Sequence, residues 1–228
     1  MTDINGILFN IAQSLPGFLL AIVAHEAAHA WMANKFGDPT AKNEGRLTLN
    51  PAAHYDPFGT ILFPIIAAVT NLPMIGWAKP VPIVTRNFKK IRQGIFWVSF
   101  AGILANMIIA LVSAIIFALI ITKVSSDWGY YSISLQMLRY SITINVLLAF
   151  FNLIPIPPLD GSKMVSIFLK GETLRKYESI ENYSQMIFIG ILLLSFLGIH
   201  TIGYILQPAF ALANSIMFGL VGLFGEMG

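Results

Sequence analysis

The sequence predicts an all-α polytopic membrane protein: a bundle of about five to six transmembrane helices with a re-entrant or extended segment after the first helix. Of the 228 residues, 56% are hydrophobic and only 11% are charged, whereas soluble domains carry about 25% charged residues. The apolar residues gather in long runs, several of which can cross roughly 30 Å of hydrocarbon as helices. The length predicts one membrane-embedded domain over residues 1–228.

Composition also restricts the chemistry of the protein. The chain has no cysteine, which excludes disulfides and thiolate metal ligands. A metal would therefore be held by histidine, carboxylate or carbonyl groups. The net charge of +3 does not indicate nucleic-acid binding, because all fourteen Lys and Arg residues lie between Lys35 and Lys176, largely in the segments that join apolar runs. The basic bias of cytoplasmic loops explains that distribution.

The first apolar run, residues 6–34, predicts a helix that crosses the bilayer and is kinked at Pro16. No Lys or Arg precedes it, so a cleaved signal peptide is not indicated. Lys35, Lys42 and Arg46 follow it. This asymmetry predicts an N-terminus outside and entry into the cytoplasm.

The same run contains His25-Glu26-Ala27-Ala28-His29. Residues four apart share one face of a helix, so His25 and His29 present two imidazoles to one point. This is the spacing of a two-histidine zinc half-site, with Glu26 placed to accept a proton from a water molecule at the metal. A chance match or a pair of core histidines is the simpler explanation. Three ionisable residues within five positions of an apolar helix argue for function, because such groups are costly in a membrane.

The next apolar run, residues 58–75, is short and is interrupted by Pro64 and Pro73. If it crossed the membrane, the basic clusters on its two sides would lie on opposite faces of the bilayer, against the positive-inside bias. We therefore expect it to enter and leave the same face. Residues 77–85 contain prolines and β-branched residues, which predict an extended segment. The second basic cluster comprises Arg86, Lys89, Lys90 and Arg92.

Residues 94–122 give the strongest transmembrane signal of the chain. Small residues within it, including Gly102, allow close helix approach, and Asn106 among them is assigned to helix packing. The next crossing is predicted over residues 138–153. Two C-terminal helices are expected within residues 184–224.

A catalytic zinc generally needs three protein ligands and one open position. His54, His200 and the acidic residues are the candidates for the third ligand, and Asp160 is the best placed. Prolines within residues 155–158 break the preceding helix, and Gly161 permits an abrupt turn. If residues 58–75 are re-entrant, Asp160 also lies on the histidines' side of the membrane. An interfacial proline turn with a capping Asp is an equally simple explanation.

These residues together resemble the site-2 protease family of intramembrane zinc metalloproteases, in its short bacterial-type branch without a PDZ domain. The resemblance covers about residues 18–165, which leaves the C-terminal helices outside it. The similar motifs are His25-Glu-Ala-Ala-His29, Gly45-Arg-Leu-Thr-Leu-Asn-Pro51, His54-Tyr-Asp-Pro-Phe-Gly-Thr60, Gly76-Trp-Ala-Lys-Pro-Val-Pro82 and Asn152-Leu-Ile-Pro-Ile-Pro-Pro-Leu-Asp160-Gly161.

The resemblance implies a Zn2+ site made by His25, His29 and Asp160. It also implies that Glu26 is the catalytic base and that Asn152 positions the substrate backbone or the oxyanion.

Three residues of the branch motifs are expected near the substrate or the active site: His54, Trp77 and Lys79. A loop histidine in a turn is the plain alternative for His54.

The expected function is that of a zinc metalloendopeptidase that hydrolyses peptide bonds within or near the transmembrane segments of transmembrane or membrane-anchored proteins. We expect a multi-pass protein of the cell membrane, with its active site toward the cytoplasm and its partners being these substrates and the lipid bilayer. The sequence identifies no regulatory membrane partner. The alternative is a metal-ion transporter using His25, His29 and Asp160 as its ion site, which would need ligands on several helices and would not require Glu26.

Overall fold

The computed structural model describes residues 4–70, 76–184, 186, 190 and 201–226, and no strand occurs among them. This confirms the all-α prediction. The helical elements are α1 (Ile4–Phe36), α2 (Thr40–Asn43), η1 (Pro51–Ala53), η2 (Pro57–Leu62), α3 (Phe63–Thr70), η3 (Thr85–Asn87), α4 (Ile91–Lys123), α5 (Tyr131–Leu153), α6 (Asp160–Ser166), α7 (Gly171–Ser179) and α9 (Thr201–Glu226).

Helices α1, α4, α5 and α9 are each long and apolar enough to cross a membrane, which confirms the polytopic class. The predicted helix over residues 184–198 lies largely outside the described residues. The expected count of five to six includes it.

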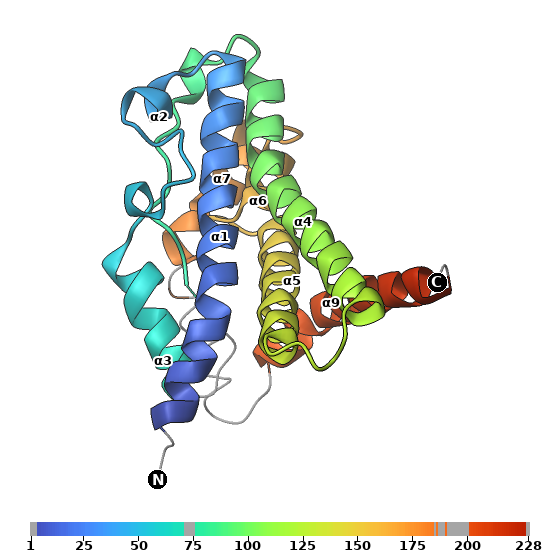
Figure 1. Ribbon diagram of the computed structural model, residues 1–228. Helices are drawn as coiled ribbons and strands as arrows, with labels where there is room; N and C mark the ends of the chain where they lie inside the picture. The colour runs from blue at the N-terminus through green and yellow to red at the C-terminus, as the bar shows by residue number, and fades with distance from the viewer. Residues whose placement is uncertain (1–3, 71–75, 185, 187–189, 191–200, 227–228) are drawn as a thin grey trace.

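Three of these helices, α1, α4 and α5, lie side by side and form the bundle that carries the site (Figure 1). Helix α1 approaches α5 closely at Gly17, where a Cβ would lie only 2.9 Å from Ser141 Cα. Apolar residues of α1, among them Phe18 and Ile22, bury themselves against Ile144 and Leu148 of α5. Burial of these faces fixes how the side chains of α1 are presented to the other two helices.

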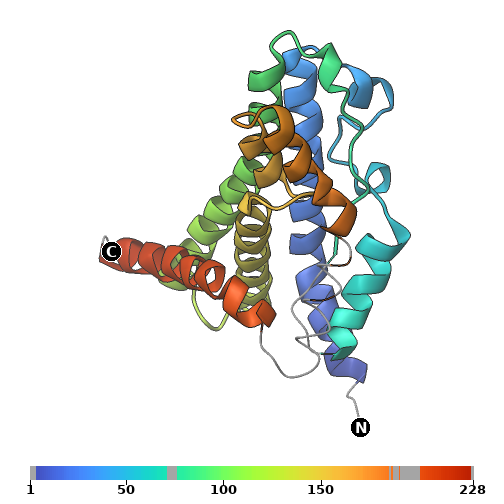
Figure 2. The same cartoon turned by 180° about the vertical axis from the view of Figure 1, so that it is seen from behind.

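Helix α9 runs across α4 and α5 at the end of the bundle remote from α7 (Figure 2). The residues of α9 that are buried in this contact, Ala209, Ala213 and Met217, belong to one apolar cluster with Phe117 of α4 and Ile142 of α5. The last helix therefore stabilises the α4–α5 pair.

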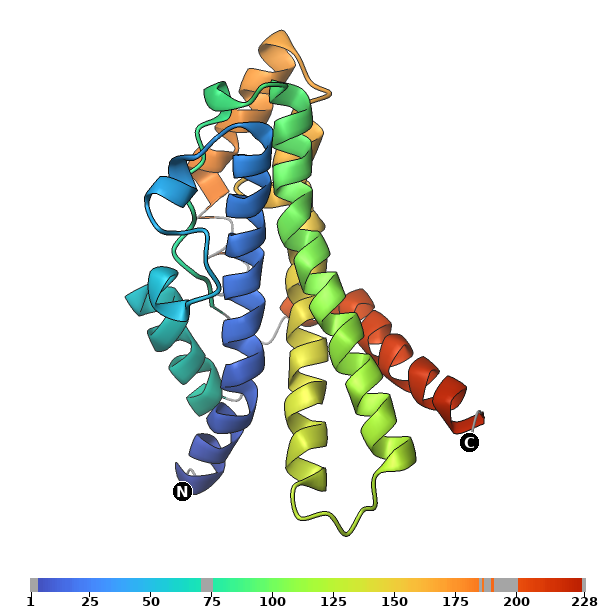
Figure 3. The same ribbon diagram turned by 45° about the horizontal axis from the view of Figure 1, so that its top comes forward.

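The segment between α1 and α4 leaves and rejoins the same end of the bundle (Figure 3). Helix α3 descends beside α1, and the extended residues 76–84 return to the start of α4. At the junction, the Lys89 N–H donates to the Phe36 carbonyl at 3.0 Å. Part of this segment is extended, as predicted, and its two ends lie at the same end of the bundle, which is the arrangement that the re-entrant prediction requires.

Asp38 holds this junction together. Its carboxylate is fully buried and accepts hydrogen bonds from the Val84 N–H, the Asn87 side chain and Thr40. Burial opposes ionisation of Asp38, but these donors outweigh it and lower the pKa of its carboxyl group. The returning segment is thus tied to the end of α1.

Candidate metal centre

The two histidines of α1 face the interior of the bundle, with exposed fractions of 8% for His25 and 6% for His29. Their Nε2 atoms lie 2.9 Å apart. Asp160 Oδ2 lies 3.1 Å from His25 Nε2 and 3.0 Å from His29 Nε2. The structure therefore brings the three sequence-predicted ligands together. Within the described part of the chain, no other group of three or more His, Asp or Glu side chains is arranged to hold a metal ion.

Asp160 reaches this point because α5 stops at Leu153 and α6 starts at Asp160 itself. The proline-rich stretch between them ends α5, as the sequence predicted. Gly161 serves a different purpose from the abrupt turn that we expected. It is part of α6, and a Cβ there would lie 2.2 Å from the Leu153 carbonyl oxygen. Gly161 is therefore needed for close approach of the two backbones.

The proton on His29 is placed by a backbone carbonyl. His29 Nδ1 lies 2.7 Å from the Val98 oxygen of α4. A carbonyl can only accept, so Nδ1 carries the proton and donates it. The neutral ring then has a lone pair on Nε2, the nitrogen that faces Asp160.

The proton on His25 is placed by Asn106, whose Oδ1 lies 2.7 Å from His25 Nδ1. The assignment of Asn106 to helix packing was incomplete. The residue does bridge helices, since its amide also donates to the Ala21 carbonyl of α1 at 3.0 Å. Its side-chain oxygen, however, accepts from His25 Nδ1. As at His29, the lone pair is left on Nε2.

Three hydrogen-bond acceptors therefore converge: the two Nε2 lone pairs and Asp160 Oδ2. Acceptors at such short separations repel one another unless a cation or a proton lies between them. Two histidines and one carboxylate are also a ligand set of catalytic zinc sites, with the fourth position left for water or substrate. The residues present therefore fit a zinc ion.

Glu26 lies on α1 between the two histidines in sequence, and it is not one of the three residues of the cluster. Its side chain is half-buried, and Oε2 accepts the Val81 N–H at 2.8 Å. This bond joins the candidate base to the extended segment. This contact could not be predicted from the sequence, because no motif or spacing relates Glu26 to Val81.

Two further residues at the cluster also escaped functional assignment from the sequence. Gly102 of α4 faces both imidazoles, and a Cβ there would lie 2.6 Å from His25 Cε1 and 2.7 Å from His29 Cε1. Lys163 of α6 places Nζ 3.4 Å from Asp160 Oδ1, the oxygen that faces away from the histidines. The glycine gives the rings room, and the lysine offsets part of the carboxylate charge.

The residues of the branch motifs lie in the loops around the extended segment. The Lys79 N–H donates to the His54 carbonyl at 2.9 Å, and the Trp77 N–H donates to the Gly59 carbonyl at 3.1 Å. Arg46 donates to the Lys79 carbonyl. The His54 ring is buried, and its Nε2 bonds to the Thr48 carbonyl at 2.9 Å. These residues hold the segment that contacts Glu26, and none of them belongs to the three-residue cluster.

Asn152 lies in the last turn of α5 and is half-buried. Its amide donates to the Leu148 carbonyl of its own helix at 3.0 Å. Its expected role toward a substrate stays a prediction.

One protein family and several known proteins are similar to this chain in sequence. The family description "Peptidase family M50" matches residues 130–196. The chain is 38% identical over 191 residues to "Putative zinc metalloprotease YwhC" of Bacillus subtilis, covering 83% of this chain and 82% of that protein. It is 27% identical over 179 residues to "Putative zinc metalloprotease Rip2" of Mycolicibacterium smegmatis, covering 78% of this chain and 66% of that protein. No solved structure matches the chain.

Proposed function

The chain belongs to the site-2 protease family, peptidase family M50, and from this premise we propose that His25, His29 and Asp160 hold its zinc ion and that Glu26 is its catalytic base. The protein is a membrane-embedded zinc metalloprotease, so a transporter that uses the same three side chains is not favoured. The convergence of three acceptors, with both Nδ1 atoms already donating, carries the assignment of the ligands.

The chemistry follows from the groups around the cluster. When bound, zinc would supply a Lewis acid that polarises the scissile carbonyl and activates water. Val81 holds Glu26 through Oε2, so Oε1 is the oxygen that takes the proton from the attacking water. Glu26 then delivers this proton to the leaving nitrogen. The substrates that we propose are the transmembrane segments of other membrane proteins.

Metal removal tests this function directly. We expect the purified protein, reconstituted in vesicles, to cleave a single-pass model substrate within its apolar segment. A strong chelator should reduce cleavage to background, and added zinc, but not magnesium, should restore it. Fragment masses identify the bond that is cut. Cleavage that is insensitive to the chelator, or confined to soluble parts of the substrate, would overturn the proposal.

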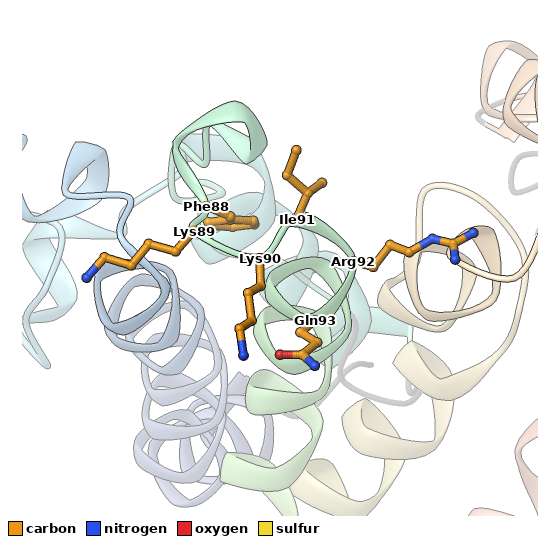
Figure 4. A pocket seen from close by; sticks show the side chains of 6 residues that line it. All are labelled: Phe88, Lys89, Lys90, Ile91, Arg92 and Gln93. Carbon is orange, nitrogen blue, oxygen red and sulfur yellow. The ribbon is translucent and has the colours of Figure 1, made fainter.

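We also propose that the protein lies in the cell membrane and that its active site is on the cytoplasmic side. His29 and His25 precede the end of α1 by 7 and 11 residues, or roughly 10 and 16 Å at 1.5 Å per residue. The same end carries the basic residues at the start of α4. Lys89, Lys90 and Arg92 fan out in different directions around a shallow pocket (Figure 4), which fits a cytoplasmic interface better than a binding site for one anion. By contrast, the connection over residues 124–130 contains no Lys or Arg.

Cysteine labelling tests the orientation, and a chain without native cysteine makes the test clean. The paired variants are Lys90→Cys and Ser126→Cys, both at exposed positions. We expect a membrane-impermeant maleimide to label intact cells only at position 126 and to reach position 90 after lysis. The reverse pattern would place the active site outside.

A further inference from the structure

Two buried amides connect the metal centre to the middle of the bundle. Asn106 of α4 and Asn145 of α5 both have an exposed fraction of 0%. The Asn106 amide nitrogen donates to Asn145 Oδ1 at 2.9 Å. Unpaired amides at this depth would be costly, so both side chains need complete sets of partners.

These partners determine which way each amide is turned. The Asn145 nitrogen donates to the Ser141 carbonyl at 2.8 Å, so its oxygen is the atom that faces Asn106. The Asn106 nitrogen donates to that oxygen and to the Ala21 carbonyl. Only Oδ1 of Asn106 is then left to face His25.

We propose that Asn106 and Asn145 are positioning residues that keep the proton of His25 on Nδ1 and thereby keep its Nε2 available to zinc. If the Asn106 amide were reversed, its nitrogen would face His25 Nδ1, which would have to give up its proton. The proton would move to Nε2 and point at His29 Nε2 and Asp160, where the metal must sit. The two hydrogen bonds from the Asn106 nitrogen oppose this reversal.

The histidines therefore differ in a way that can be tested. His29 is oriented by a backbone carbonyl, which no substitution removes. His25 is oriented by a side chain. In metal sites, losing such a partner of a histidine ligand typically lowers metal affinity about 10–100-fold.

The test compares Asn106→Asp with Asn106→Leu. The aspartate keeps an acceptor for the His25 proton, and its second oxygen, protonated at this buried position, donates to Asn145 Oδ1 in place of the amide nitrogen. The leucine has a similar size and keeps neither group. We expect zinc affinity, measured by competition with a chromophoric chelator, to fall about 10–100-fold for Asn106→Leu and to be largely retained by Asn106→Asp. If Asn106 only packs helices, the order reverses, because a buried leucine is tolerated in a membrane and a buried carboxylate is not.

Ser113→Ala is the matched control. Ser113 lies on the same helix and bonds to Ser141 Oγ of α5 at 2.9 Å. This bond uses the Ser141 side chain and leaves the Ser141 carbonyl, which accepts from Asn145, in place. Its zinc affinity should equal that of the wild type even if its melting temperature falls. Asn145→Leu supplies a second variant if Asn106→Leu fails to fold, with a smaller loss expected because the Ala21 bond still orients Asn106.

The inference rests on the proposed zinc ligands, and the two can fail separately. Wild-type protein that binds no zinc would refute the ligand assignment. If the wild type binds zinc and both leucine variants bind it with the same affinity as the wild type, only the positioning role is refuted.

Discussion

Replacing Glu26 with glutamine is expected to lower the rate of peptide hydrolysis by about 10²–10⁴-fold while zinc remains bound. Glutamine has nearly the same size and can still accept the Val81 N–H. It cannot take a proton from water at neutral pH. None of the three proposed ligands changes, so the metal content of the purified variant should equal that of the wild type.

The matched control is Glu44→Gln, in an exposed loop after α2, which should leave cleavage unchanged. Fragment release from a membrane substrate and zinc content are measured on the same samples. Undiminished cleavage by Glu26→Gln would remove Glu26 from the mechanism. Metal flux into vesicles that does not depend on Glu26 would favour the transporter alternative.

Replacing Gly102 of α4 with alanine is expected to lower both zinc affinity and the rate of cleavage, because the added methyl group would displace the histidines of α1. The added Cβ would lie 2.6–2.7 Å from atoms of both imidazoles, closer than van der Waals contact allows, so the rings or α4 must move. A displacement of about 1 Å costs on the order of 10²-fold in rate. Alanine also favours the helix by about 1 kcal/mol relative to glycine, so a weakened helix cannot explain the loss.

Gly219→Ala in α9 controls for this change, because a Cβ there meets nothing within 4 Å. Zinc affinity and cleavage should be normal for Gly219→Ala and should both fall for Gly102→Ala. If Gly102→Ala binds zinc with the affinity of the wild type, the imidazoles do not need the space that Gly102 leaves beside them.

Much of this site could be predicted because its strongest signals are local. Histidines four residues apart on an apolar helix converge without help from the rest of the chain. Asp160 lies 135 residues from His25 in the sequence. The prolines before it nevertheless indicated that it can leave the helix surface, and the distribution of basic residues indicated that it lies on the same side of the membrane as the histidines. The re-entrant segment followed from the same charges.

Other parts depend on how helices cross. Gly102 and Asn106 looked like ordinary packing residues, since small residues permit close approach without specifying what is approached. Only the register of α1 against α4 places the imidazoles over Gly102 and His25 Nδ1 against Asn106. The bond between Glu26 and Val81 likewise depends on the path of residues 76–84, which no local pattern determines.

The long separation between the proposed ligands also determines the order in which the parts of the centre are synthesised. Asn106 emerges 81 residues after His25, and Asp160 emerges 135 residues after it. At about 5–20 residues per second, the second interval lasts roughly 7–27 s. The two histidines are therefore synthesised before Asp160, and the amide of Asn106, which bonds to His25, is made before this last of the proposed ligands.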